Sequence, residues 1–353
     1  MIYTSVSQFV AWAPGGLLHS NIAGCALFAS VSGSSPATAA TIGTVAIPEM
    51  KKRGYDVNLT LGTIAAGGTL GILIPPSINM IVYGMLAQSS VGQLFAGGVL
   101  PGILLSGLFM AYIAIHVMLY PTLAPKETVR FSVKSSTLAL VNLWPLFVLG
   151  VIIFGGIFGG IMTPTEAAAV ASATAILISM ILRKFNMRML ITSLSKAAET
   201  TCMVLFIIIG ASILSSALAR GGVPQFVIQW AADSGFSRWT LLSFVYLLYI
   251  FLGCFIDPIS MLVLTASTVI PLIAALGFDL VWFGVSYVVL AEMGMITPPM
   301  GINLFVIQGI SKTPISRVTA GSFPFFIMMC VGLALMTIFP SIVLFLPQLL
   351  FGG

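Results

Sequence analysis

The sequence predicts an all-α protein that crosses a membrane many times and contains an internal repeat. Hydrophobic residues make up 59% of the 353 residues and charged residues only 7%, and the mean hydropathy is +1.13. A soluble domain carries about 25% charged residues, so the composition indicates a polytopic membrane protein. Because each span needs ~20 apolar residues, the length allows about ten spanning or re-entrant segments.

Two copies of one local pattern lie 223 residues apart. Gly71-Ile-Leu-Ile-Pro-Pro76 is matched by Gly294-Met-Ile-Thr-Pro-Pro299. A double proline inside an apolar run removes backbone donors and breaks a helix at membrane depth. Paired broken helices predict a transporter whose site lies between the two halves. The same offset of 223 relates Pro48 to Pro271, Gly54-Tyr-Asp56 to Gly277-Phe-Asp279, Gly98 to Gly321, and Pro101 to Pro324.

Basic residues outside the apolar runs predict how the chain crosses the membrane. They gather at 51–53, 126–134 and 183–196, and at Lys312 with Arg317. The positive-inside rule places all four groups on the cytoplasmic side. The loop Met50-Lys-Lys-Arg-Gly54 is basic, whereas its counterpart Ile273-Ala-Ala-Leu-Gly277 has no charge. This contrast predicts that the two repeats have opposite orientations in the membrane. Arg220 and Arg238 fall on the outer side as exceptions.

The first repeat is predicted to occupy residues 1–136. Residues 16–48 form a hairpin that enters and leaves from the cytoplasmic side and turns at Ser32-Gly-Ser-Ser-Pro36. Residues 57–88 form a helix broken at Pro75-Pro76, and residues 94–120 form a further helix. About two spans of the second repeat have no counterpart at the front. We expect the chain to be a truncated or late-start version, unless a partner supplies those helices.

The second repeat is predicted to occupy residues 137–353. It begins with scaffold helices within 138–235, where Thr163-Pro-Thr-Glu166 is typical of a capping box that starts a helix. Residues 241–272 form a second hairpin, which turns at Asp257-Pro258 and opens to the outside. Residues 280–310 form a helix broken at Pro298-Pro299, and residues 319–350 form a last helix.

The two hairpin tips carry the candidate chemistry. Hydroxyls and free backbone groups of Ser32 to Ser35 and Thr38 supply oxygen donors, which hard cations such as Na⁺ prefer, and half-helix ends add partial charge for carboxylates. The alternative is a plain Gly/Ser turn. The second tip, Asp257-Pro258-Ile-Ser260, places a carboxylate within an apolar run, where acids usually face a cavity. Alternatively, Asp257 only caps the following helix.

Free carbonyls at the helix breaks could complete a cation shell with the adjacent tip, which makes two pseudo-symmetric sites. The alternative is that neighbouring helices accommodate a simple proline kink. Glu292 is a possible proton or cation ligand, or a hydrogen-bond partner of the broken backbone. The candidate residues at the two breaks are Gly71, Ser77, Asn79, Gly294, Thr297, Pro298, Pro299 and Asn303.

Other classes of function are disfavoured. The chain has two histidines and four scattered cysteines without metal-ligand spacing, which argues against a zinc or haem enzyme and any transition metal. No Ser/His pair suggests a hydrolase, and no sequence resembles a phosphate-binding loop, so ATP drive is not expected. We expect no organic cofactor, no enzymatic activity and no nucleic-acid partner.

Several long motifs resemble one family of membrane proteins. The stretches SGSSPATAATIGTVAIPEMKKRGYD (32–56), GTLGILIPPSINMIVYG (68–84) and LFAGGVLPG (94–102) resemble the large, DctM-like membrane subunit of the tripartite ATP-independent periplasmic (TRAP) transporters. The second half is similar to the same family at MTPTEAAAVA (162–171) and EMGMITPPMGINLFVIQG (292–309). The resemblance extends from about residue 16 to the C-terminus.

This resemblance implies a secondary transporter of the elevator type in the bacterial inner membrane. It would import organic acids (C4-dicarboxylates, sialic acids or keto acids) with Na⁺, together with a small four-helix membrane subunit and a soluble periplasmic binding protein. The alternatives are a truncated, non-transporting membrane remnant and a stand-alone organic-anion/sodium symporter; an ion channel suits paired hairpins less well.

The resemblance also assigns residues to sites. One sodium site would be lined by Ser32, Gly33, Ser34, Ser35 and Gly71. The other would be lined by Asp257, Ser260, Gly294, Thr297 and Pro298. The substrate would lie between the hairpin tips, in contact with Ser35, Thr38, Ser77, Asn79, Pro258, Pro299 and Asn303.

Overall fold

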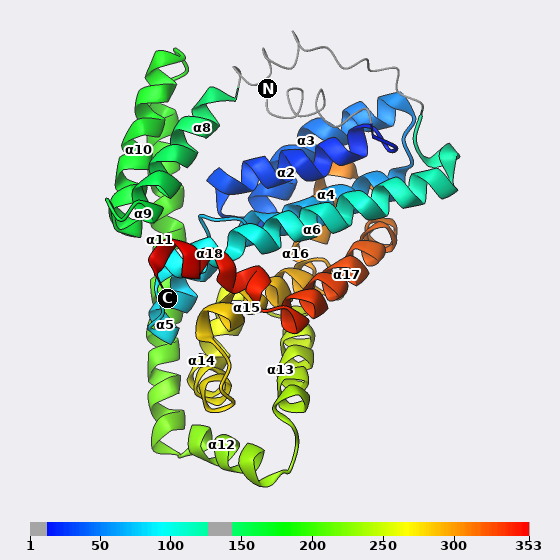
Figure 1. Cartoon of the computed structure of the whole chain (residues 1–353). Helices are drawn as coiled ribbons and strands as arrows, with labels where there is room; N and C mark the ends of the chain where they lie inside the picture. The colour runs from blue at the N-terminus through cyan, green and yellow to red at the C-terminus, as the bar shows by residue number, and fades with distance from the viewer. Residues whose placement is uncertain (1–12, 126–142, 353) are drawn as a thin grey trace.

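The computed structural model describes residues 13–125 and 143–352, and all regular structure in these two ranges is helical. Five of the described helices are long and apolar enough to cross a membrane: α6 (Val91–Leu119), α10 (Pro164–Ile181), α11 (Met187–Arg220), α14 (Pro258–Ala275) and α17 (Ile315–Ile338). A bent helix pair makes a sixth span if it is counted as one. The prediction of an all-α polytopic membrane protein is confirmed (Figure 1).

The first predicted hairpin is present as two packed helices, α2 (Leu17–Ser32) and α3 (Ser35–Arg53). Gly33 takes a φ of 61°, a left-handed conformation that ends α2 and is readily adopted only by glycine. Ser34 follows in an extended conformation, and its side chain accepts a hydrogen bond from the backbone N–H of Ala37 to cap α3. The turn therefore lies where the sequence predicted it.

Both predicted helix breaks are present at the double prolines. α4 (Val57–Leu73) and α5 (Ile78–Ala87) meet at an angle of 41°, and the Pro75–Pro76 peptide bond between them is cis. In the second half, α15 (Leu280–Met295) and α16 (Ile302–Ser311) flank the cis bond Pro298–Pro299. The missing proline N–H groups explain why neither pair continues as one helix.

The second predicted hairpin is formed by α13 (Arg238–Gly253) and α14, which pack against each other. Asp257 lies directly before α14, and Pro258 is the first residue of that helix, the position where proline is favoured. The helix pair is confirmed. Whether it is re-entrant in the membrane stays a prediction.

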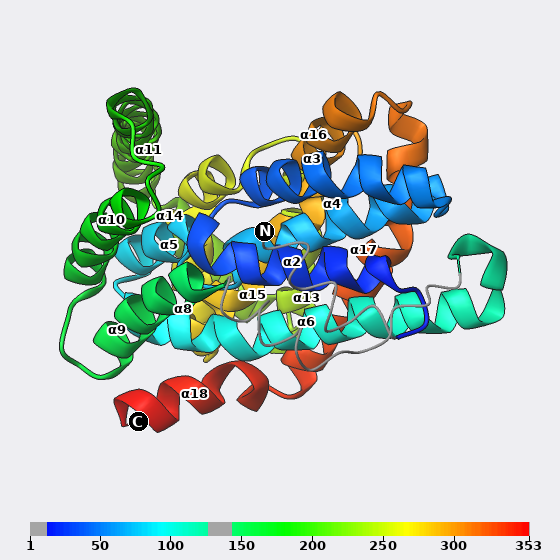
Figure 2. The same ribbon diagram turned by 90° about the horizontal axis from the view of Figure 1, so that it is seen from above.

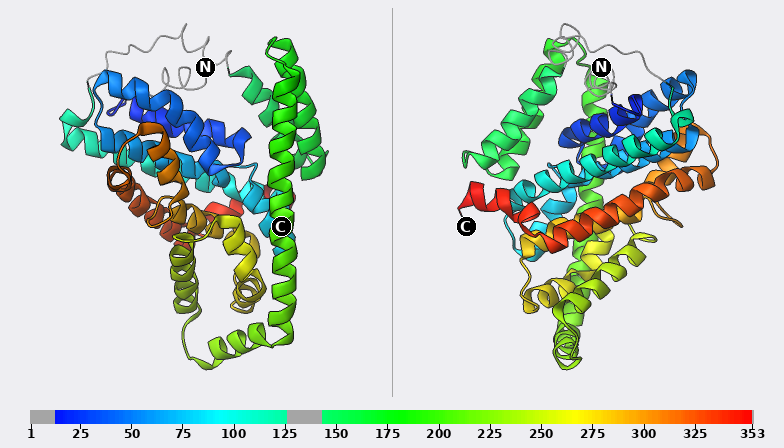
Figure 3. Two further views of the ribbon diagram at one scale, coloured as in Figure 1. Left: turned by 180° about the vertical axis from the view of Figure 1, so that it is seen from behind. Right: turned by 45° about the vertical axis from the view of Figure 1, so that its right-hand side comes forward.

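The predicted scaffold region contains a short helical segment and three longer helices. α8 (Trp144–Gly150) continues through a π-helical turn (Val151–Gly155) into α9 (Gly156–Phe158). The capping box at Thr163 and Glu166 is confirmed at the start of α10. α11 is much longer than the predicted span 197–218 and runs along one side of the molecule (Figures 1 and 3), and α12 (Val223–Asp233) then packs against α14. Residues 138–142 of the prediction lie outside the described residues.

The prediction of a single last helix over residues 319–350 is wrong, because two helices occupy this stretch. α17 ends at Ile338 and α18 begins at Ser341 and ends at Phe351. Pro340 cannot donate a backbone hydrogen bond, and it disfavours the helical conformation of Phe339, whose φ and ψ are −120° and 76°. The break turns α18 across the molecule so that it packs against α6 (Figure 2).

The core is centred on α4, which is buried at every position from Leu59 to Leu73. It packs against α2, α3 and α17, which enclose it on different sides. α4 and α17 approach closely because both carry glycine at the crossing. A Cβ on Gly62 would lie 2.0 Å from the carbonyl oxygen of Gly321, and a Cβ on Gly321 would lie 2.0 Å from that of Asn58.

Local features recur at the 223-residue spacing. Asp56 caps α4 by accepting a hydrogen bond from the N–H of Leu59, and Asp279 caps α15 in the same way from Trp282, both at 2.8 Å. Gly54 and Gly277 share a positive φ, of 79° and 75°. In the first predicted half, α6 is followed by a single described 3₁₀ turn, Pro121–Leu123. The division into two inverted repeats stays a prediction.

The close helix crossing yields a stability prediction. We expect Gly62→Ala or Gly321→Ala to lower the free energy of unfolding by ~1–3 kcal/mol, because overpacking forces the helices apart. Gly107→Ala in α6 is the matched control, since no atom of another described element lies within 4 Å of its added Cβ. Unfolding of the purified protein in detergent micelles measures the effect. Equal stability in all three variants would contradict the crossing.

Candidate functional site

The tip of the first hairpin lies directly against the first helix break. A Cβ on Gly71 would lie 2.7 Å from the carbonyl oxygen of Ser34 and 2.8 Å from Oγ1 of Thr38. A Cβ on Gly33 would lie 3.0 Å from the carbonyl oxygen of Pro76. Glycine at these two positions therefore lets the tip and the break come together with backbone oxygens at their contact.

Ser35 joins the first hairpin to both broken helices. Its Oγ lies 2.9 Å from the carbonyl oxygen of Gly68 in α4 and 2.9 Å from Oε2 of Glu292 in α15. It also accepts a hydrogen bond of 2.8 Å from Nδ2 of Asn303 in α16. Ser35 and Asn303 are 0% exposed and Glu292 is 1% exposed. This cluster, Ser35 with Glu292 and Asn303, is called the Ser35 bridge below.

The Ser35 bridge has unused hydrogen-bonding capacity. Oε1 of Glu292 and Oδ1 of Asn303 are buried and have no hydrogen-bond partner among the described residues. Nδ2 of Asn79, next to the first break, is likewise buried and without a hydrogen-bond partner among the described residues. Buried polar atoms in folded proteins are nearly always paired with protein, water or an ion. Two unpaired oxygens near the hairpin tip therefore fit the donor set that a hard cation takes.

The second hairpin tip packs on the second break through a pair of glycines. A Cβ on Gly294 would lie 2.5 Å from the carbonyl oxygen of Gly253. The N–H of Met300 donates to the carbonyl oxygen of Cys254 at 3.0 Å, which ties the loop after the prolines to the end of α13. A cavity of about 280 Å³ lies at this contact, lined by residues of the tip and of the break, including Asp257, Gly294 and Gly301.

Asp257 caps a helix and also lines that cavity. Its Oδ1 accepts hydrogen bonds of 3.1 Å from the N–H groups of Ile259 and Ser260, so it caps α14. It is only partly buried and lines the cavity. The carbonyl oxygen of Pro258 accepts a hydrogen bond from the hydroxyl of Tyr287. Capping is thus confirmed, and a cation-linked role for the carboxylate stays a prediction.

The remaining predicted residues divide by position. Ser77 is fully buried and caps α5 through the N–H of Met80 at 3.4 Å. Oγ of Ser32 donates to the carbonyl oxygen of Ser34, and Oγ1 of Thr38 donates to the same oxygen at 2.8 Å. Oγ1 of Thr297 donates to the carbonyl oxygen of Met293. Pro298 and Pro299 are exposed and do not belong to the buried Ser35 bridge.

A tyrosine cluster next to the site was not found from the sequence. The rings of Tyr83 and Tyr287 stack with centroids 6.3 Å apart, and those of Tyr249 and Tyr287 meet edge to face at 5.1 Å. The hydroxyl of Tyr83 donates to the carbonyl oxygen of Leu280 at 2.8 Å. The cluster joins α5 of the first half to α13 and α15 of the second. A hydroxyl within an apolar run was the available signal, but aromatic residues are common packing material there.

Comparison with known proteins places the chain beside a family of transport proteins. The model of the "Tripartite ATP-independent periplasmic transporter, DctM component" family matches residues 1–342. The C4-dicarboxylate TRAP transporter large permease protein DctM of Vibrio cholerae is 38% identical, over 97% of this chain and 80% of that protein. The sialic acid TRAP transporter large permease protein SiaM of the same species is 33% identical, over 99% and 82%.

A relative named for a different ligand is as similar to this chain as SiaM is. The ectoine TRAP transporter large permease protein TeaC of Halomonas elongata is 33% identical, over 98% of this chain and 81% of that protein. The matching region therefore includes both hairpins and both breaks, whatever compound the relative is named for.

The Ser35 bridge yields a second stability prediction. Ser35→Ala leaves buried polar groups of Glu292 and Asn303 without this partner, so we expect a loss of ~1–3 kcal/mol in the free energy of unfolding. Ser30→Ala is the control, because within the described part of the chain its exposed hydroxyl bonds only to the carbonyl oxygen of Leu27, and such changes usually stay within about 0.5 kcal/mol. Chemical denaturation in micelles measures both, and a Ser35→Ala protein as stable as the wild type would refute the bridge.

Proposed function

This chain belongs to the DctM-component family of tripartite ATP-independent periplasmic transporters, and we propose that it is the large permease subunit of a Na⁺-coupled secondary transporter that imports organic acids. It is a multi-pass protein of the bacterial inner membrane, and members of its family are transport permeases rather than enzymes. One observation carries the proposal. Each hairpin tip packs through glycine against a proline-broken helix, with oxygen atoms at the contact.

The donor atoms at the two contacts support Na⁺ as the coupling ion. At the first contact, the carbonyl oxygen of Ser34 and the hydroxyl of Thr38 border Gly71, and the carbonyl oxygen of Pro76 borders Gly33. At the second, the Gly253 carbonyl and the Asp257 carboxylate border the cavity. Hard cations are bound by such oxygen ligands, and a single carboxylate limits the desolvation that a buried charge costs. A bound Na⁺ would supply positive charge next to an anionic substrate.

The length of the first arm of each hairpin supports re-entrant hairpins. α2 and α13 have 16 residues each, which gives a length of about 24 Å at 1.5 Å per residue. The hydrocarbon core of a bilayer is ~30 Å thick, so these arms are too short to cross it upright. Their tips would then lie within the membrane, at the level of the helix breaks. We propose that the two tips and breaks move together past the scaffold helices, as in an elevator.

The substrate class is proposed from the chemistry between the tips. Two of the relatives are named for C4-dicarboxylates and sialic acids, and both kinds of compound carry carboxylates. The described lining of the site has no Lys or Arg, so a carboxylate would be held by half-helix N-termini and polar side chains. Ser77 caps α5 and Asn79 is the second residue of that helix, and Asn303 is the second residue of α16. The donor Nδ2 of Asn79 has no partner in the described structure and suits a carboxylate oxygen.

The exposed apolar scaffold supports the proposal of a membrane partner. Of the residues of α11, only Ala211 is buried, and large apolar residues such as Phe206 (79% exposed) and Ile213 (68%) face outward. An apolar surface of this size is covered by lipid or by another membrane protein. We propose that a small four-helix membrane subunit covers part of it and that a soluble periplasmic binding protein delivers the substrate.

Substitution at each hairpin tip tests the proposal. Asn caps helices as well as Asp does, so Asp257→Asn removes the charge and keeps the cap. We expect the Na⁺ concentration for half-maximal uptake to rise about tenfold, which corresponds to ~1.4 kcal/mol of lost cation binding. Ser34→Ala, at the other tip, should also lower uptake. The assay is substrate uptake into vesicles that contain the permease with its small subunit and binding protein.

Controls separate this proposal from its alternatives. Asp233→Asn is the matched control, since Asp233 is exposed on α12 and bonds only to Gln229 in the described structure. Unchanged uptake and unchanged Na⁺ dependence in both tip variants would defeat the site assignment. Uptake that persists without the binding protein would favour a stand-alone symporter. No uptake in any combination would favour a non-transporting membrane remnant.

A further inference from the structure

A second cavity lies away from both hairpin tips and has a basic lining. Its volume is about 280 Å³, and it lies between the end of α3, the start of α4 and the loop that joins α16 to α17. Lys51 of α3 and Arg317 of α17 both line it, although they lie far apart in the sequence. None of the residues proposed for the transport site lines this cavity.

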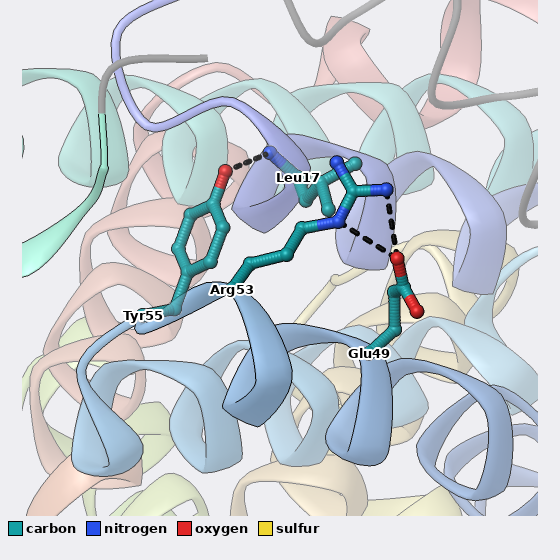
Figure 4. A network of polar contacts seen from close by, with 4 residues as sticks. All are labelled: Leu17, Glu49, Arg53 and Tyr55. Atoms are coloured by element: carbon teal, nitrogen blue, oxygen red, sulfur yellow. Dashed lines mark hydrogen bonds and ion pairs between the residues drawn. The ribbon is translucent and has the colours of Figure 1, made fainter.

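The positive charge in this cavity is not neutralised by the described part of the protein. Neither Lys51 nor Arg317 takes part in an ion pair among the described residues. The two nearby acids are already engaged. Glu49 pairs with Arg53 at 2.7 Å on the outer face of α3 (Figure 4), and Asp56 caps α4. The cavity is therefore an electropositive site bordered by further basic residues of the predicted cytoplasmic clusters.

Hydroxyl donors complete the lining. Thr60 is 4% exposed, and its Oγ1 is buried without a hydrogen-bond partner in residues 13–125 and 143–352. Oγ of Ser311 accepts a hydrogen bond from the N–H of Thr313 at 3.2 Å, which leaves its proton free to donate. A buried hydroxyl without a partner indicates a missing acceptor, because leaving it unpaired costs ~1–3 kcal/mol. The hydroxyls and the two cations require a ligand that accepts several hydrogen bonds and carries negative charge.

The walls of the cavity are held in place by local contacts. Tyr55 follows the positive-φ residue Gly54, and its hydroxyl accepts a hydrogen bond from the N–H of Leu17 at 3.1 Å (Figure 4). This contact fixes the α3–α4 turn against the start of α2. On the other side, α17 starts after Pro314 without a side-chain cap. Its first turn therefore adds a partial positive charge near the cavity.

We propose that this cavity binds a phosphate group. A phosphate offers oxygen acceptors in several directions, which matches a Lys ammonium, an Arg guanidinium and hydroxyls that come from separate elements. The group belongs either to free inorganic phosphate or to the headgroup of an anionic phospholipid. The partly exposed Val57 at the rim gives an acyl chain an apolar path out of the cavity. The basic clusters predicted here belong to the cytoplasmic side, where anionic lipids attract them.

A phosphate in this position would connect the two halves of the molecule. Lys51 and Thr60 belong to the first half, and Ser311 and Arg317 belong to the second. The ligand would therefore join the base of the first hairpin to the end of the second broken helix. This inference does not depend on Na⁺ coupling or on the identity of the transported acid.

The test is the thermal unfolding of the full chain in maltoside micelles, which contain no phosphate. Inorganic phosphate is titrated at constant ionic strength against chloride, and in a second arm the micelles contain phosphatidylglycerol or phosphatidylcholine. We expect the unfolding midpoint to rise by about 3 °C with phosphate, with phosphatidylglycerol, or with both, as a ligand of the folded state requires. A rise with phosphate identifies the free anion as sufficient, and a rise with phosphatidylglycerol alone identifies the lipid.

Variants decide whether the effect arises in this cavity. The double variant Lys51→Gln/Arg317→Gln should lose the rise, and Arg188→Gln/Lys196→Gln on the exposed start of α11 should keep it. Thr60→Val should raise the midpoint without ligand, because it removes an unpaired hydroxyl, and should reduce the phosphate-dependent rise. If the double variant does not fold, Thr60→Val decides alone. No rise in either arm, an equal rise with succinate or phosphatidylcholine, or a rise retained in the decisive variant overturns the proposal.

Discussion

Backbone groups released by the two proline breaks have to find partners inside the membrane, and the arrangement of the site follows from that requirement. Each break lies where a hairpin tip can reach it, and glycine at the contact allows backbone to approach backbone. Gly71 admits the first tip and Gly294 admits the second. The result is two contacts rich in oxygen atoms, which supply potential cation ligands with few full charges.

The two contacts are not independent, because the Ser35 bridge and the tyrosine cluster cross between the halves. Ser35 belongs to the first tip, yet it bonds to Glu292, 257 residues away in the helix that precedes the second break. A displacement of the first tip would remove a buried partner from the second broken helix. The cost of leaving such groups unpaired couples the first tip energetically to the second broken helix.

Features with local chemistry could be predicted from the sequence, and features that depend on distant contacts could not. The Gly33 turn, the double-proline breaks and the cap at Asp257 follow from backbone preferences of single residues. The contact between Ser35 and Glu292 depends on packing across the whole chain, so Glu292 could only be named as a candidate. A single proline was ambiguous, because Pro324 stays inside α17 whereas Pro340 ends it.

Binding of Na⁺ by each hairpin tip together with its helix break is the central requirement of the proposed transport. Calorimetric titration of the purified protein with Na⁺ tests it directly when the wild type is compared with Gly71→Ala and Gly294→Ala. Each added Cβ would lie within 3 Å of the opposing tip or helix end, so each variant should lose Na⁺ binding at one contact. Gly309→Ala, with no atom near its Cβ, should bind as the wild type does. Wild-type Na⁺ stoichiometry and affinity in the folded Gly71→Ala and Gly294→Ala proteins would contradict Na⁺ binding at these contacts.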